Sequence, residues 1–262
     1  MSKILIFDSG VGGISIYKAI KEQLPSADYL YLFDNKYFPY GELESEFLIE
    51  RVCQLIDYMC ENHRPDLVVI ACNSASTLVL PALRKRFSIP FVGVVPAIKP
   101  AALQSKKKRI GLLATPGTVS REYTQLLVNE HAQDCEIDMI GSTSLVLQAE
   151  NKLYGHPVDL DAINNVVSKW TDPQNSPDVV VLGCTHFPLL VTELEASLGK
   201  HIQFIDSGMA IALRVKDILG EENTALDTCN IGKSFCTKIQ AQKKLTLLFN
   251  GIGLSQPLYI DV

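Results

Sequence analysis

Two cysteines occupy equivalent places in two similar stretches of this sequence, DLVVIACNS at 66–74 and DVVVLGCTH at 178–186. The stretches align at a constant offset of 112 residues, so Cys72 matches Cys184. In each, an Asp opens an apolar run that predicts a buried strand, the Cys follows the run, and a helical pattern comes next. A thiol placed between a strand and a helix meets the positive end of the helix dipole, which favours the thiolate.

A duplicated thiol suits a reaction that needs an acid and a base on opposite faces of one small substrate. Free cysteine has a pKa of about 8.5, so a thiol and a thiolate can exchange these roles near neutral pH. One thiolate would remove a Cα proton while the opposing thiol protonates the other face. The pattern therefore predicts racemisation or epimerisation. Burial in the core is the ordinary alternative for a cysteine, but it does not explain the polar residues that follow each one.

A glycine-rich stretch, FDSGVGG at 7–13, follows the first apolar run. Glycines at such a turn allow backbone N–H groups to approach a carboxylate or phosphate. The spacing G-x-G-G differs from the dinucleotide fingerprint G-x-G-x-x-G, and no acidic residue follows at the required distance. A tight turn between strand and helix is the simpler interpretation of the glycines. Asp8 adds a carboxylate that could hold an ammonium group or tune a thiol.

Apolar runs alternate with amphipathic stretches of helical length along most of the chain. Strands are predicted at 3–7, 28–33, 67–71, 90–94, 109–114, 135–140, 178–183 and 202–205. Helices are predicted at about 13–24, 43–62, 75–87, 117–130, 143–152, 159–169, 187–198 and 207–219. Strands that are apolar along their whole length are typical of parallel sheets covered by helices on both faces. The alternation therefore predicts an α/β fold.

The repeat extends beyond the two cysteine stretches, because residues 3–10 are weakly similar to residues 109–116. This predicts two pseudo-symmetric α/β domains with mostly parallel central sheets flanked by helices. Ligands of open α/β sheets bind beyond the carboxyl ends of the strands, so we expect the active site in a cleft between the domains. Trp170 and residues 171–178, which are rich in polar residues and proline, are expected to form a surface loop.

The composition narrows the class of protein. The 262 residues include 24 Lys and Arg against 29 Asp and Glu, a formal net charge of −5, which lacks the basic footprint of a nucleic-acid-binding protein. No apolar run reaches the roughly 18–20 residues of a membrane span, and the run at 4–7 is too short for a signal-peptide core. We therefore expect a cytoplasmic protein with no nucleic-acid or membrane partner.

The seven cysteines form no C-x-x-C pair and no Cys/His pattern with zinc spacing. We therefore expect reduced thiols and no metal site. Cys53 and Cys60 fall on or near the apolar face of a predicted helix. Cys229 and Cys236, in the segment after residue 220, are interpreted as a reduced, partly buried pair.

Five blocks, in this order, make the chain resemble the glutamate racemases of the aspartate/glutamate racemase superfamily. They are FDSGVGG at 7–13, FPYG at 38–41, ACNSAS at 71–76, ATPGTV at 114–119 and GCTHFPLL at 183–190, and the resemblance covers residues 1 to about 220. It implies a cofactor-independent racemase that supplies D-glutamate for peptidoglycan and forms a homodimer. It also implies one domain from 1–95 plus 207–262 and a second from 96–206.

The resemblance assigns roles to individual residues. Cys72 would be the base toward D-glutamate and Cys184 the base toward L-glutamate, assisted by Asp8 and His186 respectively. Glu150 is the candidate for an additional glutamate near the site. The residues expected to bind substrate are Asp8, Ser9, Tyr40, Gly41, Asn73, Ser74, Thr185 and His186.

Three other functions stay open on the sequence. The first is racemisation of aspartate or isomerisation of another acid, although FPYG and CTHFPLL favour glutamate. The second is non-catalytic binding of a dicarboxylate, which would need no pair of opposed thiols. The third is a metal-dependent hydrolase that uses Cys184 and His186, for which no further ligand cluster is found at suitable spacing.

Overall fold

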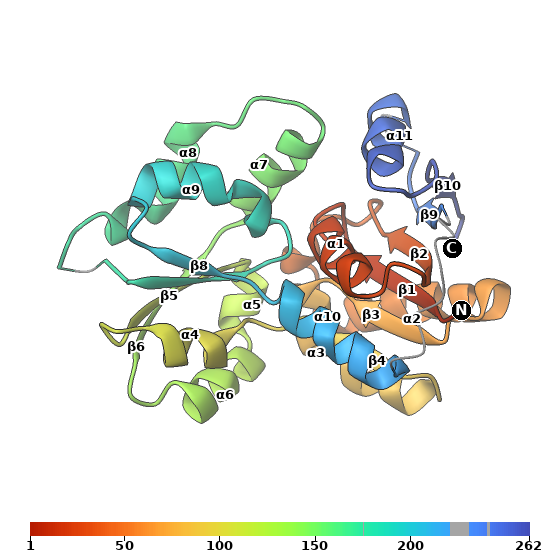
Figure 1. The fold of residues 1–262 in the computed structure, drawn as a ribbon, viewed down its shortest axis with the longest axis horizontal. Helices are drawn as coiled ribbons and strands as arrows, with labels where there is room; N and C mark the ends of the chain where they lie inside the picture. Colours follow the sequence, from red (N-terminus) through yellow and green to blue (C-terminus); the bar gives the residue numbers. More distant parts are fainter. Residues whose placement is uncertain (175, 221–230, 240–241) are drawn as a thin grey trace. The chain divides into compact units, whose positions relative to one another are not determined.

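The computed structural model describes residues 1–174, 176–220, 231–239 and 242–262. The chain divides into two compact α/β units (Figure 1). Unit 1 comprises Met1–Val94 and Gly208–Val262, and unit 2 comprises Val95–Ser207. Every pairing between the described strands is parallel, which confirms the predicted fold class.

Unit 1 contains a six-stranded sheet in the order β10-β9-β2-β1-β3-β4. Its strands are β1 (Lys3–Asp8), β2 (Asp28–Phe33), β3 (Leu67–Ile70), β4 (Phe91–Gly93), β9 (Lys233–Cys236) and β10 (Leu258–Tyr259). Its helices are α1 (Ile14–Gln23), α2 (Ser45–His63), α3 (Asn73–Arg86), α10 (Gly208–Leu219), α11 (Gln242–Gly251) and the 3-10 helix η1 (Tyr40–Glu42). Helix α1 packs against α10, and α2 packs against α3.

Unit 2 contains a four-stranded sheet in the order β6-β5-β7-β8. Its strands are β5 (Arg109–Ala114), β6 (Glu136–Gly141), β7 (Val179–Gly183) and β8 (Gln203–Ile205). Its helices are α4 (Ile98–Gln104), α5 (Pro116–Ser120), α6 (Glu122–His131), α7 (Thr143–Leu153), α8 (Leu160–Val167), α9 (Val191–Leu198) and the 3-10 helices η2 (Ser168–Trp170) and η3 (Phe187–Leu190). Helices α7, α8 and α9 lie on one side of this sheet, and α4 and α6 lie on the other (Figure 1).

The central strands are buried along almost their whole length, as their apolar sequences predict. In β3 and β7 every residue is buried, and in β1 and β5 only the first residue is half-exposed. The edge strand β6 is mostly half-exposed, because a strand pairs on one side only at the edge of a sheet. Helices on both faces exclude water from the central strands, and this selects for uninterrupted Val, Ile and Leu.

The strand pairings in the two sheets follow the same repeat as the sequence. Strand β1 pairs with β3 so that Phe7 lies opposite Ile70, and β5 pairs with β7 so that Leu113 lies opposite Leu182. Ile70 and Leu182 are related by the 112-residue offset of the cysteine stretches, and Phe7 and Leu113 by the 106-residue offset of the weaker repeat. Cys72 is the second residue after Ile70, and Cys184 is the second residue after Leu182. The two thiols therefore lie at equivalent positions beyond the ends of their strands.

The Asp that opens each cysteine strand has the same structural role in both units. The Oδ2 atom of Asp66 accepts the backbone N–H of Lys3 at 2.7 Å, at the start of the neighbouring strand β1. The Oδ2 atom of Asp178 accepts the N–H groups of Lys106 and Lys107 at 2.7 and 2.9 Å, just before β5. These carboxylates hold the amino ends of adjacent strands in register, which accounts for their repetition.

Trp170 is wrongly predicted as part of a surface loop, because its side chain is fully buried in unit 2. The indole packs on the Cα face of Gly111 in β5, where a Cβ atom would lie 2.9 Å from the ring. The indole Nε1 donates a hydrogen bond to Asp138 Oδ2 at 2.7 Å. A strand glycine therefore creates the space that the tryptophan fills.

Other differences concern element boundaries and the segment after residue 220. The helix predicted at 117–130 is two helices, α5 and α6, separated at Arg121. Residues 231–239 and 242–262 contribute β9, α11 and β10, and β9 pairs with β2. Cys53 and Cys236 are buried reduced thiols, whereas Cys229 lies outside the described residues.

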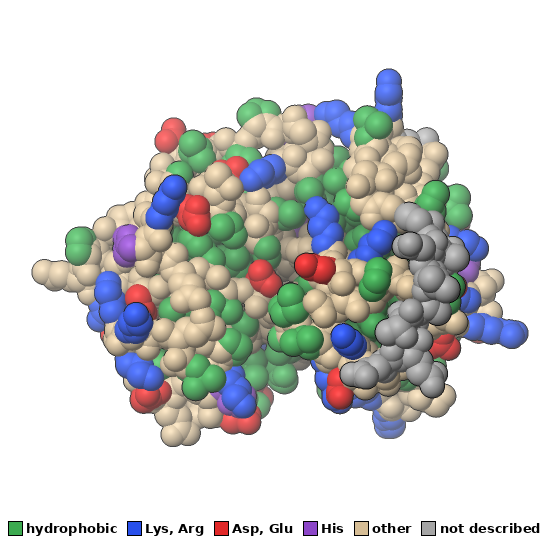
Figure 2. Space-filling model, viewed as in Figure 1, with side chains coloured by type: hydrophobic (Ala, Val, Ile, Leu, Met, Phe, Trp, Pro, Cys, Tyr) green, Lys and Arg blue, Asp and Glu red, His purple; other side chains and the backbone are tan. Residues whose placement is uncertain are grey.

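The distribution of charged side chains on the surface agrees with the formal net charge of −5. On the face shown in Figure 2, Lys and Arg side chains are interspersed with Asp and Glu. None of the helices in the described ranges is both long and apolar enough to cross a membrane.

Candidate active site

Cys72 lies between the end of β3 and the first turn of α3, where it is the N-cap residue. Its side chain is 6% exposed. The first N–H groups of a helix have no partner within the helix, so the thiol faces the positive end of a 14-residue helix. The Sγ atom lies 3.8 Å from the hydroxyl of Ser9 at the end of β1.

Asp8 ends β1 and is fully buried. Its carboxylate accepts the backbone N–H of Ser9 at 2.7 Å and that of Gly13, and the Ser9 hydroxyl lies 3.4 Å away. A side chain on Gly13 would clash, since its Cβ would lie 2.9 Å from both Asp8 Cβ and the Tyr31 hydroxyl. The glycine-rich turn therefore binds the chain's own carboxylate and connects it to Cys72 through Ser9.

Asn73 and Ser74 form the start of α3, and both are buried beside Cys72. Among the side chains that the structure describes, the buried Nδ2 atom of Asn73 is one without a hydrogen-bond partner. Leaving a buried donor unsatisfied costs about 1–3 kcal/mol. A buried amide next to a thiol is therefore available to donate to a bound oxygen.

Tyr40 and Gly41 lie in η1, which contacts α3, the helix that follows Cys72. The Tyr40 ring is buried, its centroid lies 6.2 Å from that of Phe7, and its hydroxyl donates to Asp34 Oδ2 at 2.6 Å. Burial, followed by the charge of Asp34, raises the pKa of Tyr40 well above its ordinary value. The hydroxyl is therefore a neutral donor already engaged by Asp34, while Gly41 is half-buried.

Cys184 follows β7 in unit 2, and its side chain is 7% exposed. Its Sγ atom lies 3.8 Å from Nδ1 of His186, and Nε2 of the same ring lies 2.8 Å from Oε2 of Glu150 in α7. The next element is the 3-10 helix η3, so Cys184 precedes a tighter turn than the α-helix predicted at 187–198. Thr185, which lies between the cysteine and the histidine in sequence, is also buried.

The imidazole of His186 is 2% exposed and has a partner on each nitrogen. Burial by itself lowers the pKa of His186, but the hydrogen bonds to Cys184 and Glu150 and the charge of Glu150 outweigh it. The net result is a pKa well above the ordinary value of 6.5. An imidazolium beside a sulfur atom stabilises the thiolate and can hold or return its proton.

The predicted residues fall into two groups, one in each unit. Unit 1 contains Asp8, Ser9, Tyr40, Gly41, Cys72, Asn73 and Ser74. Unit 2 contains Glu150, Cys184, Thr185 and His186.

Asp34, the buried carboxylate that binds Tyr40, is not among the residues predicted from the sequence. Two features of the sequence could have pointed to it. Asp34 directly follows an apolar strand, as Asp8 does, and Arg51, its ion-pair partner, interrupts the apolar face of α2.

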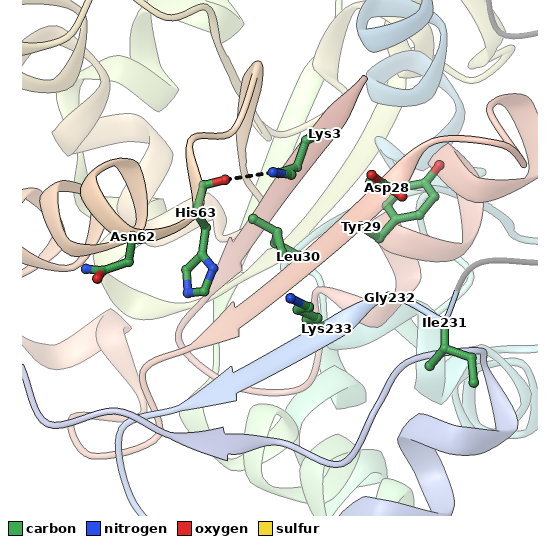
Figure 3. A pocket seen from close by; sticks show the side chains of 9 residues that line it. All are labelled: Lys3, Asp28, Tyr29, Leu30, Asn62, His63, Ile231, Gly232 and Lys233. Carbon is green, nitrogen blue, oxygen red and sulfur yellow. Dashed lines mark hydrogen bonds between the residues drawn. The ribbon is translucent and has the colours of Figure 1, made fainter. Parts of the chain in front are cut away.

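A cavity of about 340 Å³ in unit 1 is lined by none of the predicted site residues. Its lining includes the first residues of three strands, Lys3 of β1, Asp28 of β2 and Lys233 of β9 (Figure 3). The Lys3 ammonium donates to the backbone oxygen of His63 at 2.9 Å. Because the strands are parallel, this cavity lies at their amino ends, whereas Cys72 follows a carboxyl end.

Within the described ranges, no group of three or more His, Cys, Asp and Glu side chains is arranged to hold a metal ion. Cys184, His186 and Glu150 form a chain of contacts, thiol to imidazole to carboxylate. In this order the imidazole, oriented by the carboxylate, can accept a proton from the thiol and return it.

Residues 4–215 match the family described as Asp/Glu/Hydantoin racemase. A glutamate racemase of Aliivibrio fischeri is 53% identical over 234 residues, which cover 89% of this chain and 87% of that protein. A glutamate racemase of Vibrio cholerae is 54% identical over 84% of this chain and 82% of its own length. The crystal structure of Escherichia coli glutamate racemase with L-glutamate and the activator UDP-MurNAc-Ala superposes with a TM-score of 0.93 at 43% identity, covering 100% of this chain and 98% of that one.

Proposed function

The chain belongs to the Asp/Glu/hydantoin racemase family, and we propose from this that it interconverts L- and D-glutamate without a cofactor. The relatives described above are glutamate racemases, and the Escherichia coli enzyme was crystallised with L-glutamate. The D-glutamate formed would serve the synthesis of peptidoglycan.

The equivalent placement of the two thiols carries this proposal. Cys72 and Cys184 follow matching strands in the same register, and each has its own group for handling a proton. A two-base racemase needs such a pair, with one thiolate and one thiol on opposite faces of the substrate. A protein that only binds a dicarboxylate gains nothing from either thiol.

On the Cys72 side, the thiolate would remove the Cα proton of D-glutamate. The positive end of α3 favours the thiolate, and Ser9 connects the sulfur to the buried carboxylate of Asp8. Asp8 would also attract the substrate ammonium group toward Cys72. The donors of Asn73 and Ser74 would bind substrate oxygens without adding charge.

On the Cys184 side, the thiol would deliver a proton to the opposite face and would act as the base in the reverse reaction. The imidazolium of His186 stabilises the Cys184 thiolate after it has given up its proton. Glu150 holds the imidazole through Nε2 and keeps Nδ1 directed at the sulfur. Thr185 would supply a further neutral donor.

The Cα proton of an amino acid is very weakly acidic, so the site must stabilise the developing carbanion. Fixed donors in a site that excludes water can do this. The proposal includes the two units as domains, 1–95 with 207–262 and 96–206, each of which supplies one of the two thiols. It also includes a cytoplasmic homodimer.

Proton exchange followed by NMR tests the proposed function. Purified, reduced protein is incubated with D-glutamate in D₂O without pyridoxal phosphate, and deuterated L-glutamate is measured. We expect turnover by the unaltered protein and at least about a 10³-fold loss in Cys72→Ala and Cys184→Ala, since each removes a reacting group. Cys53→Ala is the matched control, because that thiol is 7% exposed but lies on α2.

Other outcomes would identify other functions. Exchange with aspartate but not with glutamate would keep the two-thiol chemistry and change the substrate. Tight binding of glutamate without any exchange would indicate a binding protein and contradict the proposal.

A further inference from the structure

Asp34 directly follows β2 and is the centre of a buried polar network in unit 1. Its side chain is 0% exposed and accepts hydrogen bonds from three others. The Tyr40 hydroxyl donates to Oδ2 at 2.6 Å, and the Thr237 hydroxyl donates to Oδ1 at 2.6 Å. The Arg51 guanidinium donates through Nε and Nη2, both at 2.9 Å.

The ion pair of Asp34 and Arg51 is costly to bury. The Arg51 side chain is only 5% exposed, so both charges have lost most of their hydration. Buried ion pairs can often be replaced by apolar residues without loss of stability, so such a pair is weak evidence for a purely stabilising role. A fully satisfied buried network does fix the geometry of its members.

One end of this network reaches the buried cluster that contains the candidate base Cys72. Tyr40 and Cys72 belong to the same buried cluster, together with Phe7 of β1. The charge of Cys72 is also one of the causes that raise the pKa of Tyr40, so the ring lies within electrostatic range of the sulfur. A shift of this ring would therefore change the surroundings of the Cys72 sulfur. The hydroxyl that fixes this ring is held by Asp34.

The other end of the network holds residues far along the chain. Thr237 follows β9, and its N–H donates to Asn35 Oδ1 at 3.1 Å. Lys238 N–H donates to the same oxygen at 2.9 Å, and Asn35 Nδ2 donates to the Lys238 carbonyl oxygen at 2.8 Å. Arg51 Nη1 also donates to the backbone oxygen of Val262. Two adjacent residues after β2 thus bind both Tyr40 and the residues that follow β9.

We propose that Asp34, Arg51 and Thr237 are positioning residues that use the segment after β9 to hold Tyr40 in the buried cluster that contains Cys72. The inference rests on the proposed glutamate racemase function and deepens it. It makes the segment after β9 part of the Cys72 half-reaction. None of the three residues needs to touch the substrate, because each acts through Tyr40.

Thr237→Val is the test variant, because valine keeps the shape and removes the hydroxyl, which donates to Asp34 and accepts the backbone N–H of Lys36 at 3.1 Å. Asp34 keeps its bonds to Arg51 and Tyr40 but loses a restraint on its orientation. We expect kcat/KM to fall about threefold to tenfold, well short of the loss of a reacting group. L- and D-glutamate have equal free energies in water, so kcat/KM must fall equally in both directions.

Isotope effects show which thiol is affected. In the D-to-L direction Cys72 removes the label from C2-deuterated D-glutamate, so a slower Cys72 step raises the isotope effect on kcat/KM. In the L-to-D direction Cys184 removes the label, and that step becomes less rate-limiting, so the isotope effect falls. A general loss of structure would leave both isotope effects unchanged.

Two further variants complete the experiment. Thr237→Ser restores the hydroxyl and should return both isotope effects to those of the unaltered protein. Ser234→Ala is the matched control, because this buried hydroxyl in β9, three residues before Thr237, donates to the Ser255 backbone oxygen at 2.6 Å and has no bond to Asp34. It should leave kcat/KM within about twofold of the unaltered protein.

The outcomes separate this inference from the function on which it rests. No glutamate turnover by the unaltered protein would remove the proposed function. Normal turnover, with isotope effects in Thr237→Val that match those in Ser234→Ala, would overturn the positioning role alone. Opposite shifts of the two isotope effects, reversed by Thr237→Ser, would support it.

Discussion

The two cysteine sites stand on matching strands but obtain their proton-handling groups from different places. In unit 1 the carboxylate comes from Asp8, at the end of the neighbouring strand β1, and reaches Cys72 through Ser9. In unit 2 the imidazole comes from His186, two residues after Cys184, and is held by Glu150 of α7. The repeated scaffold places the thiols, and residues beyond the strand ends determine the chemistry around each.

The equivalent positions emphasise this difference. The last residue of β1 is Asp8, whereas the last residue of β5 is Ala114, which has no carboxylate. Ser74 occupies the place in unit 1 that His186 occupies under the 112-residue offset. In the proposed reaction this asymmetry has a use, since the carboxylate side would also attract the substrate ammonium group.

The largest expected effects come from removing the two unlike partners. Asp8→Asn and His186→Asn should each lower kcat/KM by about 10²–10⁴-fold, the range for loss of a group that assists proton transfer. Because each acts on a different thiol, the isotope effect should increase for D-glutamate in Asp8→Asn and for L-glutamate in His186→Asn. Racemisation of each C2-deuterated enantiomer, followed by circular dichroism, measures this.

His201→Asn provides the control for the imidazole change, because that histidine is exposed and lies in the turn before β8, outside the Cys184 segment. It should leave both rates within about twofold. Isotope effects that move in the same direction in Asp8→Asn and His186→Asn would show that the two sides are not specialised.

The second prediction compares the stability of the two units. Gly111→Ala places a methyl group 2.9 Å from the Trp170 ring, so we expect unit 2 to lose about 1–3 kcal/mol by overpacking. Trp170 is the single tryptophan of the sequence and is buried in unit 2, so its fluorescence during urea unfolding reports on that unit. The midpoint should fall to lower urea.

Gly251→Ala in unit 1 is the matched control, since its Cβ would have no heavy atom within 4 Å. The tryptophan transition should not move in this variant. An unchanged midpoint in Gly111→Ala would mean that the indole can shift without cost, and would contradict the tight packing described for unit 2.

The sheets could be predicted because burial on both faces leaves a strong pattern in the sequence. Strands β1 and β5 to β8 appear as apolar runs close to their observed ends. Strand β9, KSFC, has four residues and begins with a lysine, so it leaves no comparable pattern. Its place is decided by pairing with β2, where Leu32 lies opposite Phe235, and no local sequence contains that information.

Without the family resemblance, the candidate site could be predicted only where the residues that form it are neighbours in sequence or members of the repeat. Cys72 and Cys184 stand out because they recur, and His186 because it follows closely. The contact between His186 and Glu150 joins residues 36 positions apart through packing of α7 on η3, so spacing could not reveal it. The same holds for Asp34 and Thr237, which lie 203 positions apart.

The smallest expected effect is a pH dependence of stability that belongs to unit 2 alone. Burial lowers the folded-state pKa of His186, but the interactions with Cys184 and Glu150 raise it by more. The folded-state pKa therefore lies above its ordinary value of 6.5. Between pH 6.5 and the folded-state pKa, His186 is protonated in the folded protein but neutral in the unfolded chain, so folding takes up a proton. The pair of His186 and Glu150 therefore contributes its full stability below about pH 6.5. The contribution is lost as pH rises through the folded-state pKa.

Glu150→Gln isolates this contribution, because glutamine keeps the shape and removes the charge that raises the histidine pKa. The difference in unfolding free energy between the unaltered protein and Glu150→Gln should be greatest below about pH 6.5 and should shrink by about 1 kcal/mol as the pH rises. Urea unfolding followed by Trp170 fluorescence measures it. Glu136→Gln, which alters an exposed pair with Arg109, should show a difference of at most about 0.5 kcal/mol that does not vary over this range. If Glu150→Gln behaves like Glu136→Gln, then His186 is neutral in the folded protein, and the contrast between a carboxylate-assisted thiol in unit 1 and an imidazolium-assisted thiol in unit 2 is wrong.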